Sequence, residues 1–222
     1  RSARTVSTEK GGAYEYEKLI LALGSAPVVL PIPGIDKKGV FAIHKEMGYL
    51  QDAVARVKKC RKVLVIGGGF IGVEFADELA GIEGMEVTLV EMLPHLLANS
   101  FDEEFSQMAE KRLTDKGVRV LTGTRVEEIL GGDRVEQVQL SGGRKFPVDA
   151  VILGVGSRPN VKLAVEAGLE IGRCKGILVD EYTRTTLDQN IFAIGDCSCK
   201  RDFYTRKAIP VMLASTATAE AR

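Results

Sequence analysis

Four apolar runs in the chain each end in a glycine, and their pattern predicts buried parallel strands. The runs cover residues 18–24, 62–67, 149–154 and 190–195. Each is an almost unbroken series of aliphatic residues, which is typical of strands that are covered on both faces. A glycine directly after a strand lets the backbone come close to another group. In open α/β sheets, ligands bind at this carboxyl edge.

The segments between these runs predict helices and further strands, and therefore an α/β fold. Helices are expected over residues 46–59, 70–80, 100–116 and 211–222. Shorter strands are expected at residues 87–91 and 118–121, and an antiparallel hairpin at residues 125–130 and 135–140. Ser100 and Glu103 have the spacing of a capping box, and Gly117 fits the end of the helix that they would open.

A glycine-rich turn follows the second apolar run. Gly67, Gly69 and Gly72 match the pattern G-x-G-x-x-G, directly after a strand and before a helix. The first glycine permits a tight turn, the second lets a pyrophosphate reach the backbone, and the third lets the helix pack on the strand. Phe70 and Ile71 lie in the same turn, where a helix N-terminus favours phosphate. The turn predicts a dinucleotide site, and a purely structural glycine turn is the alternative.

Two acidic residues near this turn are further candidates. Glu91 ends the next strand 19 residues after Gly72, where a carboxylate can accept hydrogen bonds from the adenine ribose. A 2′-phosphate would meet a like charge there, and residues 92–94 offer no arginine, so NAD is favoured over NADP. Alternatively, Glu91 caps the strand edge in solvent. Glu74 is expected in the first helical turn, where the helix dipole alone also favours an acidic residue.

The fourth apolar run leads into Gly195 and Asp196, which again place a carboxylate at a strand end. Asp196 could accept from sugar hydroxyls, or it could be the N-cap of the next segment. Cys197 and Cys199 follow, but their separation is unfavourable for a disulfide and no further metal ligands lie nearby. We therefore expect these two thiols to be incidental and the chain to hold no metal.

Composition narrows the class of protein. The 30 basic and 30 acidic residues give a formal net charge of zero, which provides no basic surface for nucleic acid or anionic lipid. The hydrophobic fraction of 45% and the charged fraction of 27% are close to the averages for globular domains. No uncharged stretch reaches the roughly 20 apolar residues of a membrane span. We therefore expect a cytoplasmic protein that binds neither nucleic acid nor membrane.

The order of the motifs is more informative than any one of them. Residues 16–27, 67–74, 153–160 and 194–196 follow one another, and the tail 210–217 completes the series. In this order the chain resembles the flavin-dependent pyridine nucleotide–disulfide oxidoreductases, in particular the NADH oxidases and coenzyme A-disulfide reductases. The resemblance covers essentially all 222 residues. It implies NADH and FAD as cofactors, hydride transfer from NADH to FAD, and a homodimeric parent with a small-molecule electron acceptor.

In that family, a Rossmann-like NAD-binding domain is inserted into an FAD-binding domain. The resemblance implies that residues 1–42 are the first, incomplete part of the FAD-binding domain and residues 43–60 a linker helix. It further implies that residues 61–156 are the NAD-binding domain and residues 157–222 the returning part of the FAD-binding domain.

The resemblance also implies roles for single residues. It places Glu74 at the junction of nicotinamide and flavin, and Gly154 and Gly156 beside the nicotinamide. The residues that it implies for FAD are Leu23, Gly24, Gly195, Asp196, Leu213, Ala214 and Ser215.

The sequence departs from the family pattern in two ways. It contains neither the first G-x-G-x-x-G of the FAD-binding domain nor the reactive cysteine that follows it, because none of its four cysteines matches that position. It also lacks the C-terminal dimerisation domain, so it looks like the middle of an enzyme. We therefore expect the isolated chain to be colourless and without turnover. A stand-alone NAD-binding module is the alternative. The electron acceptor stays open among oxygen, coenzyme A disulfide, polysulfide, nitrite-reductase partners and rubredoxin.

Overall fold

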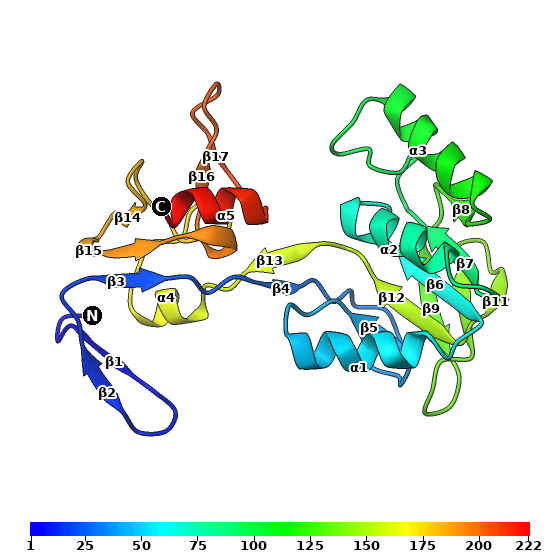
Figure 1. The fold of residues 1–222 in the computed structure, drawn as a ribbon, viewed down its shortest axis with the longest axis horizontal. Coiled ribbons are helices and arrows are strands. Elements are labelled where there is room, and N and C mark those ends of the chain that lie inside the picture. The colour runs from blue at the N-terminus through cyan, green and yellow to red at the C-terminus, as the bar shows by residue number, and fades with distance from the viewer. The chain divides into compact units, whose positions relative to one another are not determined.

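The computed structural model describes residues 1–222, which divide into two compact units (Figure 1). Unit 1 consists of Arg1–Ala26 and Arg158–Arg222, and unit 2 of Pro27–Ser157. Unit 2 is therefore a continuous insert in unit 1. Its boundaries differ from those expected for the inserted domain, because residues 27–60 pack within unit 2 instead of preceding it.

A five-stranded parallel sheet forms the centre of unit 2, with the strand order β5-β12-β6-β7-β8. The strands are β5 (Val40–Ala42), β6 (Lys62–Ile66), β7 (Glu86–Val90), β8 (Arg119–Leu121) and β12 (Ala150–Leu153). All four residues of β12 and the last four of β6 are buried. The prediction that these two runs are parallel strands covered on both faces is therefore confirmed.

Successive residues of β6 pack into two different cores. Val63 and Val65 face the helices α1 (Met47–Val57), α2 (Phe70–Ala80) and α3 (Glu103–Asp115). Leu64 and Ile66 face a three-stranded antiparallel sheet of β9 (Val126–Leu130), β10 (Gln137–Leu140) and β11 (Lys145–Pro147). Because both faces of the strand are covered, its four buried residues, 63–66, are all apolar. The predicted hairpin corresponds to β9 and β10.

The ends of the helices test the capping predictions. α2 has the predicted bounds, but α3 begins at Glu103 with Asp102 as its N-cap, so the predicted capping box of Ser100 and Glu103 is wrong. The amide of Ser100 instead donates to Leu97 O in the preceding turn. Gly117 ends α3 as predicted, at φ +89°, and Val118 N–H donates back to Leu113 O.

Unit 1 has a smaller three-stranded sheet in the order β14-β15-β3. The strands are β3 (Leu19–Leu21), β14 (Arg184–Thr185) and β15 (Asp188–Ala193), and β3 and β15 are parallel. The further elements of unit 1 are β1 (Thr5–Ser7), β2 (Ala13–Glu15), α4 (Lys162–Glu166), the 3-10 turn η1 (Gly195–Cys197), β16 (Lys200–Arg201), β17 (Ala208–Ile209) and α5 (Ala214–Glu220). The last helix is shorter than the predicted 211–222. At the junctions of the units, β4 (Ser25–Pro27) pairs with β13 (Ser157–Pro159).

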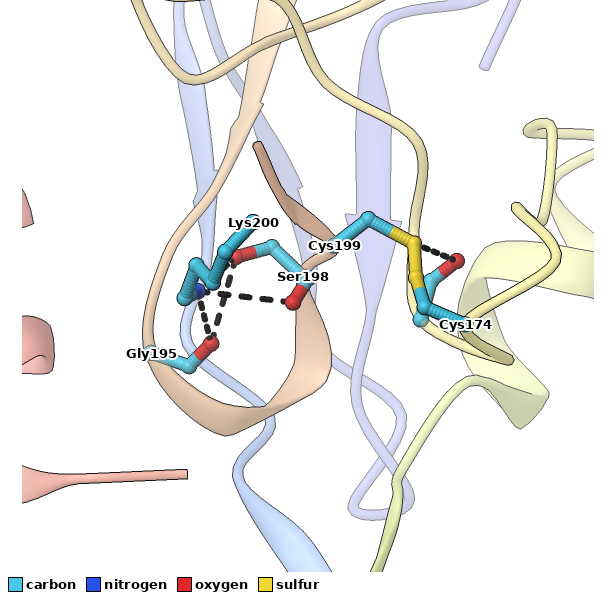
Figure 2. The surroundings of a disulfide bond; sticks show 6 residues. Cys174, Gly195, Ser198, Cys199 and Lys200 are labelled. Carbon is cyan, nitrogen blue, oxygen red and sulfur yellow. Dashed lines mark hydrogen bonds between the residues drawn. A yellow bond between two sulfur atoms is a disulfide. The ribbon is translucent and has the colours of Figure 1, made fainter. Parts of the chain in front are cut away.

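A disulfide joins Cys174 to Cys199 in unit 1, with their Cα atoms 6.0 Å apart (Figure 2). The expectation that Cys199 is an incidental thiol is therefore wrong. The partner lies 25 residues away and is brought close by hydrogen bonds around Ile177, whose N–H donates to Cys197 O and whose carbonyl accepts from Cys199 N–H, both at 2.8 Å. Cys60 and Cys197 are free thiols.

No helix of the chain has the length and apolar character needed to span a bilayer.

Candidate functional site

Three glycines form one close backbone contact at the carboxyl edge of the sheet in unit 2. Gly67 adopts φ +105°, and a Cβ on it would lie 2.7 Å from the carbonyl oxygen of Gly154. A Cβ on Gly72 would overlap the carbonyl oxygen of Gly67, and one on Gly154 would lie 2.8 Å from Gly72 Cα. These contacts let the start of α2 pack directly on the ends of β6 and β12. Gly67, Gly72 and Gly154 are thus required by packing.

Gly69 differs from these three glycines because it is exposed and faces open space. A Cβ at this position would meet no atom within 4 Å. Gly69 is the N-cap of α2, and no side chain caps the helix. Because the first amides of a helix have no partner within it, the N-terminus of α2 can receive an anionic group. Phe70 and Ile71 follow in the first turn, and the Phe70 side chain is exposed.

Glu91 bonds to the same glycine turn. Its carboxylate accepts hydrogen bonds from Gly68 N–H at 2.5 Å and from Leu93 N–H at 2.7 Å. Glu91 therefore caps two backbone amides, one directly after the strand, as in the structural alternative, and one in the glycine turn. An ionised carboxylate has about four acceptor sites, so Glu91 keeps acceptor capacity for a ligand hydroxyl.

Gly68 was missed as a site residue by the sequence analysis. A Cβ on Gly68 would lie 2.9 Å from Glu91 Cβ and 2.5 Å from Leu96 Cδ2. A glycine is thus needed there for Glu91 to reach the turn. Gly68 is the middle one of three consecutive glycines, 67–69, and this unbroken run was the signal that could have revealed it.

Glu74 lies elsewhere on α2 than expected. The first turn of α2 has no acidic residue, because Glu74 is the fifth residue of the helix. The prediction that it lies in the first turn is wrong, and the helix dipole gives only a weak reason for an acidic residue there. The side chain is exposed. Gly156 is also exposed, adopts φ +89° and faces open space.

In unit 1, the structure brings Asp196 together with the first segment of the chain. Ser25 Oγ donates to Asp196 Oδ2 at 2.8 Å, although the two residues lie 171 positions apart. Asp196 lies within η1, and Ile194 is the N-cap of that turn, so the alternative that Asp196 acts as an N-cap is wrong for η1. Gly195 begins the turn at φ +69°.

Leu23 and Gly24 are held from the returning segment. Asn160 Nδ2 donates to Leu23 O at 2.9 Å, and Asn160 N–H donates to Gly24 O at 3.0 Å. Gly24 adopts φ +65°, and a Cβ on it would meet no atom within 4 Å. The backbone at Gly24 is therefore open to a ligand. Ser25 and Asn160 lie within the motif segments 16–27 and 153–160, but the sequence assigned neither of them a role, because their partners are distant along the chain.

The remaining predicted residues lie at the start of α5. Leu213 is the N-cap of this helix, Ala214 and Ser215 begin it, and all three are exposed. α5 packs against η1, where a Cβ on Gly195 would lie 3.5 Å from Ala217 Cβ. The structure thus brings the Gly195–Asp196 turn next to α5, and Ser25 next to Asp196.

The free cysteines are poor nucleophiles. Burial raises the pKa of the Cys197 thiol, which is fully buried and lies 3.3 Å from Leu21 O. Burial also raises the pKa of the Cys60 thiol. Because the thiolate is the reactive form, neither residue has the features of a redox-active cysteine.

Both units fit the nucleotide cofactors expected from the sequence. In unit 2, the uncapped start of α2 and the acceptor Glu91 suit the phosphates and a ribose. In unit 1, the open backbone at Gly24 and the oriented carboxylate of Asp196 suit a ligand that carries hydroxyls.

Comparison with known proteins gives consistent matches. Residues 1–221 match the profile of the family described as "Pyridine nucleotide-disulphide oxidoreductase". The nitrite reductase (NAD(P)H) of Bacillus subtilis is 37% identical over 195 residues, which cover 88% of this chain and 24% of that protein. The NADH oxidase of Methanocaldococcus jannaschii is 37% identical over 195 residues, which cover 86% of this chain and 42% of that protein.

A solved structure shows the same fold. The NAD-dependent persulfide reductase of A. fulgidus superposes with a TM-score of 0.91 at 35% sequence identity. The superposition covers 99% of this chain and 41% of that one. The chain thus spans between about a quarter and two fifths of the length of the proteins that it matches here.

Proposed function

Because the chain belongs to the pyridine nucleotide-disulphide oxidoreductase family, we propose that it forms the NADH-binding unit and part of the FAD-binding unit of a flavoprotein that oxidises NADH. The observation that supports this most directly is the uncapped start of α2 beside Glu91, whose carboxylate bonds to Gly68 N–H. Unit 2 would bind NADH through Gly67, Gly69 and Gly72 and the amides near Phe70 and Ile71. Gly154 and Gly156 would lie beside the nicotinamide.

Glu91 would select NADH over NADPH. Its carboxylate would accept hydrogen bonds from the adenine ribose and would repel a 2′-phosphate. The two hydrogen bonds from Gly68 N–H and Leu93 N–H hold this carboxylate beside the glycine turn without consuming all of its acceptor sites.

Unit 1 would contribute to FAD binding. Gly195 and Asp196 would bind the ribityl and phosphate part, Leu23 and Gly24 would close the first part of the site, and the start of α5 (Leu213, Ala214 and Ser215) would approach the ring system. When bound, FAD supplies the two-electron redox chemistry that accepts a hydride from NADH. Glu74 would lie where nicotinamide and flavin meet.

The proposed electron acceptor is oxygen, with a disulfide such as coenzyme A disulfide as the alternative. The names of the matched proteins, nitrite reductase, NADH oxidase and persulfide reductase, refer to different acceptors. The region that these three proteins share with this chain is therefore best assigned to the binding and oxidation of NADH, and not to reduction of the acceptor. The complete protein would act as a homodimer.

Titration with NADH tests the nucleotide assignment. The chain has no Trp, so the fluorescence of bound NADH can be followed without tryptophan emission. Glu91→Ala removes a charge-assisted hydrogen bond of about 1.5–3 kcal/mol, so NADH should bind roughly tenfold or more weakly while NADPH binds as before or better. Glu86→Ala is the matched control, because Glu86 is exposed at the start of β7, whereas Glu91 directly follows the end of this strand.

The proposal fails for unit 2 if NADH shows no saturable binding, or if Glu91→Ala weakens NADH and NADPH equally. A complete protein that binds NADH but contains no flavin and oxidises no NADH would instead favour a stand-alone NAD-binding module.

A further inference from the structure

A largely buried ion pair lies in unit 1, outside the residues predicted from the sequence. Lys200 Nζ is 2.9 Å from Glu220 Oε2, and the two side chains are only 9% and 17% exposed. A lysine is rarely buried to this extent without a specific partner. The position of this pair therefore needs an explanation.

Both members of the pair bind the same residue, Gly195. Lys200 Nζ donates to the carbonyl oxygen of Gly195 at 2.6 Å, and Gly195 N–H donates to Glu220 Oε2 at 2.8 Å. Lys200 Nζ also donates to Ser198 Oγ at 2.5 Å (Figure 2). Both backbone polar groups of Gly195 are thus fixed by the charged pair, directly before Asp196.

The pair also connects two elements that carry predicted FAD residues. Lys200 follows η1, which contains Gly195 and Asp196, whereas Glu220 is the last residue of α5. The first residues of the same helix are Ala214 and Ser215. Glu220 lies on the same helix as these residues, five positions after Ser215, so fixing Glu220 also restricts where they lie.

We propose that the Lys200–Glu220 ion pair is a positioning pair for FAD, which holds the Gly195–Asp196 turn and α5 in the geometry that binds the cofactor. This inference rests on the proposed function. Lys200 and Glu220 act through Gly195 and α5 rather than by touching the cofactor. Replacement of Lys200 by an apolar residue leaves Glu220 without its counterion and the carbonyl of Gly195 without its charged donor.

The first test measures the turn itself in the 222-residue chain. Amide hydrogen exchange at residues 195–197 should become at least about tenfold faster in Lys200→Met and in Glu220→Gln, which is the change in opening equilibrium expected when one charge-assisted hydrogen bond is lost. Lys162→Met is the matched control, because Lys162 and Glu166 form an exposed pair at 3.8 Å in the same unit. This control should leave exchange at residues 195–197 unchanged.

The second test measures the dissociation constant for FAD in the complete flavoprotein, by recovery of flavin fluorescence. Lys200→Met and Glu220→Gln should each raise the dissociation constant for FAD at least about tenfold. In the double variant, this constant should rise by less than the product of the two single increases. The affinity for NADH, which is assigned to unit 2, should stay within about twofold. Lys200→Arg keeps the charge and serves as a folded comparison if Lys200→Met does not fold.

The outcomes separate this inference from the proposed function. A complete wild-type protein that binds no FAD overturns the proposed function and this inference with it. If the wild type binds FAD and both Lys200→Met and Glu220→Gln bind it equally tightly, only the positioning role is overturned. Faster exchange at residues 195–197 with unchanged FAD affinity also overturns it, because the pair would then stabilise the turn without affecting the cofactor.

Discussion

Reduction of the Cys174–Cys199 disulfide should destabilise unit 1 and leave unit 2 unchanged. The bridge joins residues 25 positions apart within unit 1, whereas unit 2 contains only the free thiol Cys60. A crosslink stabilises a fold mainly by restricting the unfolded chain, and the effect grows with the length of the loop that it closes.

The size of the effect follows from the loop length. In the chain-entropy relation, a closed loop of about 25 residues corresponds to about 3.5 kcal/mol at 25 °C. For a unit of about 90 residues, each 1 kcal/mol corresponds to about 4–8 °C in Tm. Reduction should therefore lower the melting temperature of unit 1 by roughly 15–25 °C.

Differential scanning calorimetry with and without a phosphine reductant measures this shift. The transition of unit 1 should move and that of unit 2 should stay in place, which provides an internal control. Cys174→Ser should melt like the reduced wild type and should not respond to reductant. Cys60→Ser should keep the full response, since Cys60 takes no part in the bridge.

Two results would refute this reasoning. Alkylation of the unfolded, unreduced chain should modify two cysteines, and modification of all four would show that the bridge is absent. If the bridge is present but its reduction shifts the unit 1 transition by less than a few degrees, the loop-entropy argument does not apply to this chain.

Further predictions concern the glycine turn, a free thiol and an acidic residue. Gly72→Ala should destabilise unit 2 by at least about 1–3 kcal/mol in thermal melts, because its Cβ would overlap a backbone oxygen, whereas Gly69→Ala should cost less than about 1 kcal/mol. Cys197 should react with iodoacetamide at neutral pH only after unfolding, because burial raises the pKa of its thiol; rapid labelling of the native chain would contradict this. Burial opposes ionisation of Asp180, but hydrogen bonds from Arg184 hold the pKa of this carboxyl below its usual value. The ionised Asp180 carboxylate should thus stabilise the fold fully above about pH 4, and this stabilisation should be lost as the pH falls further. Asp180→Asn should therefore flatten the dependence of Tm on pH in that range.

The elements that depend on a local sequence pattern were predicted best. The apolar runs of β6 and β12 and the bounds of α2 follow from unbroken aliphatic stretches and a glycine-rich start, and the structure confirms all three. The capping box of α3 failed because two residues near one another, Asp102 and Ser100, both suit the start of a helix.

Long-range contacts could not be predicted in this way. Cys174 meets Cys199 only because Ile177 pairs with the segment that contains Cys197 and Ser198. Lys200 and Glu220 belong to no sequence motif and lie 20 positions apart. The hydrogen bond of Ser25 to Asp196 depends on the return of the chain to unit 1 after the insert. Such contacts are products of the fold and leave no periodic signal.

The contact among Gly67, Gly72 and Gly154 has a genetic consequence. The atoms nearest to an added Cβ at Gly72 are the backbone oxygen and carbonyl carbon of Gly67. Shortening a neighbouring side chain therefore creates no room for a larger residue at this position. A selection for second-site suppressors of Gly72→Ala should recover mainly true revertants or substitutions that stabilise unit 2 elsewhere, and no local compensating change.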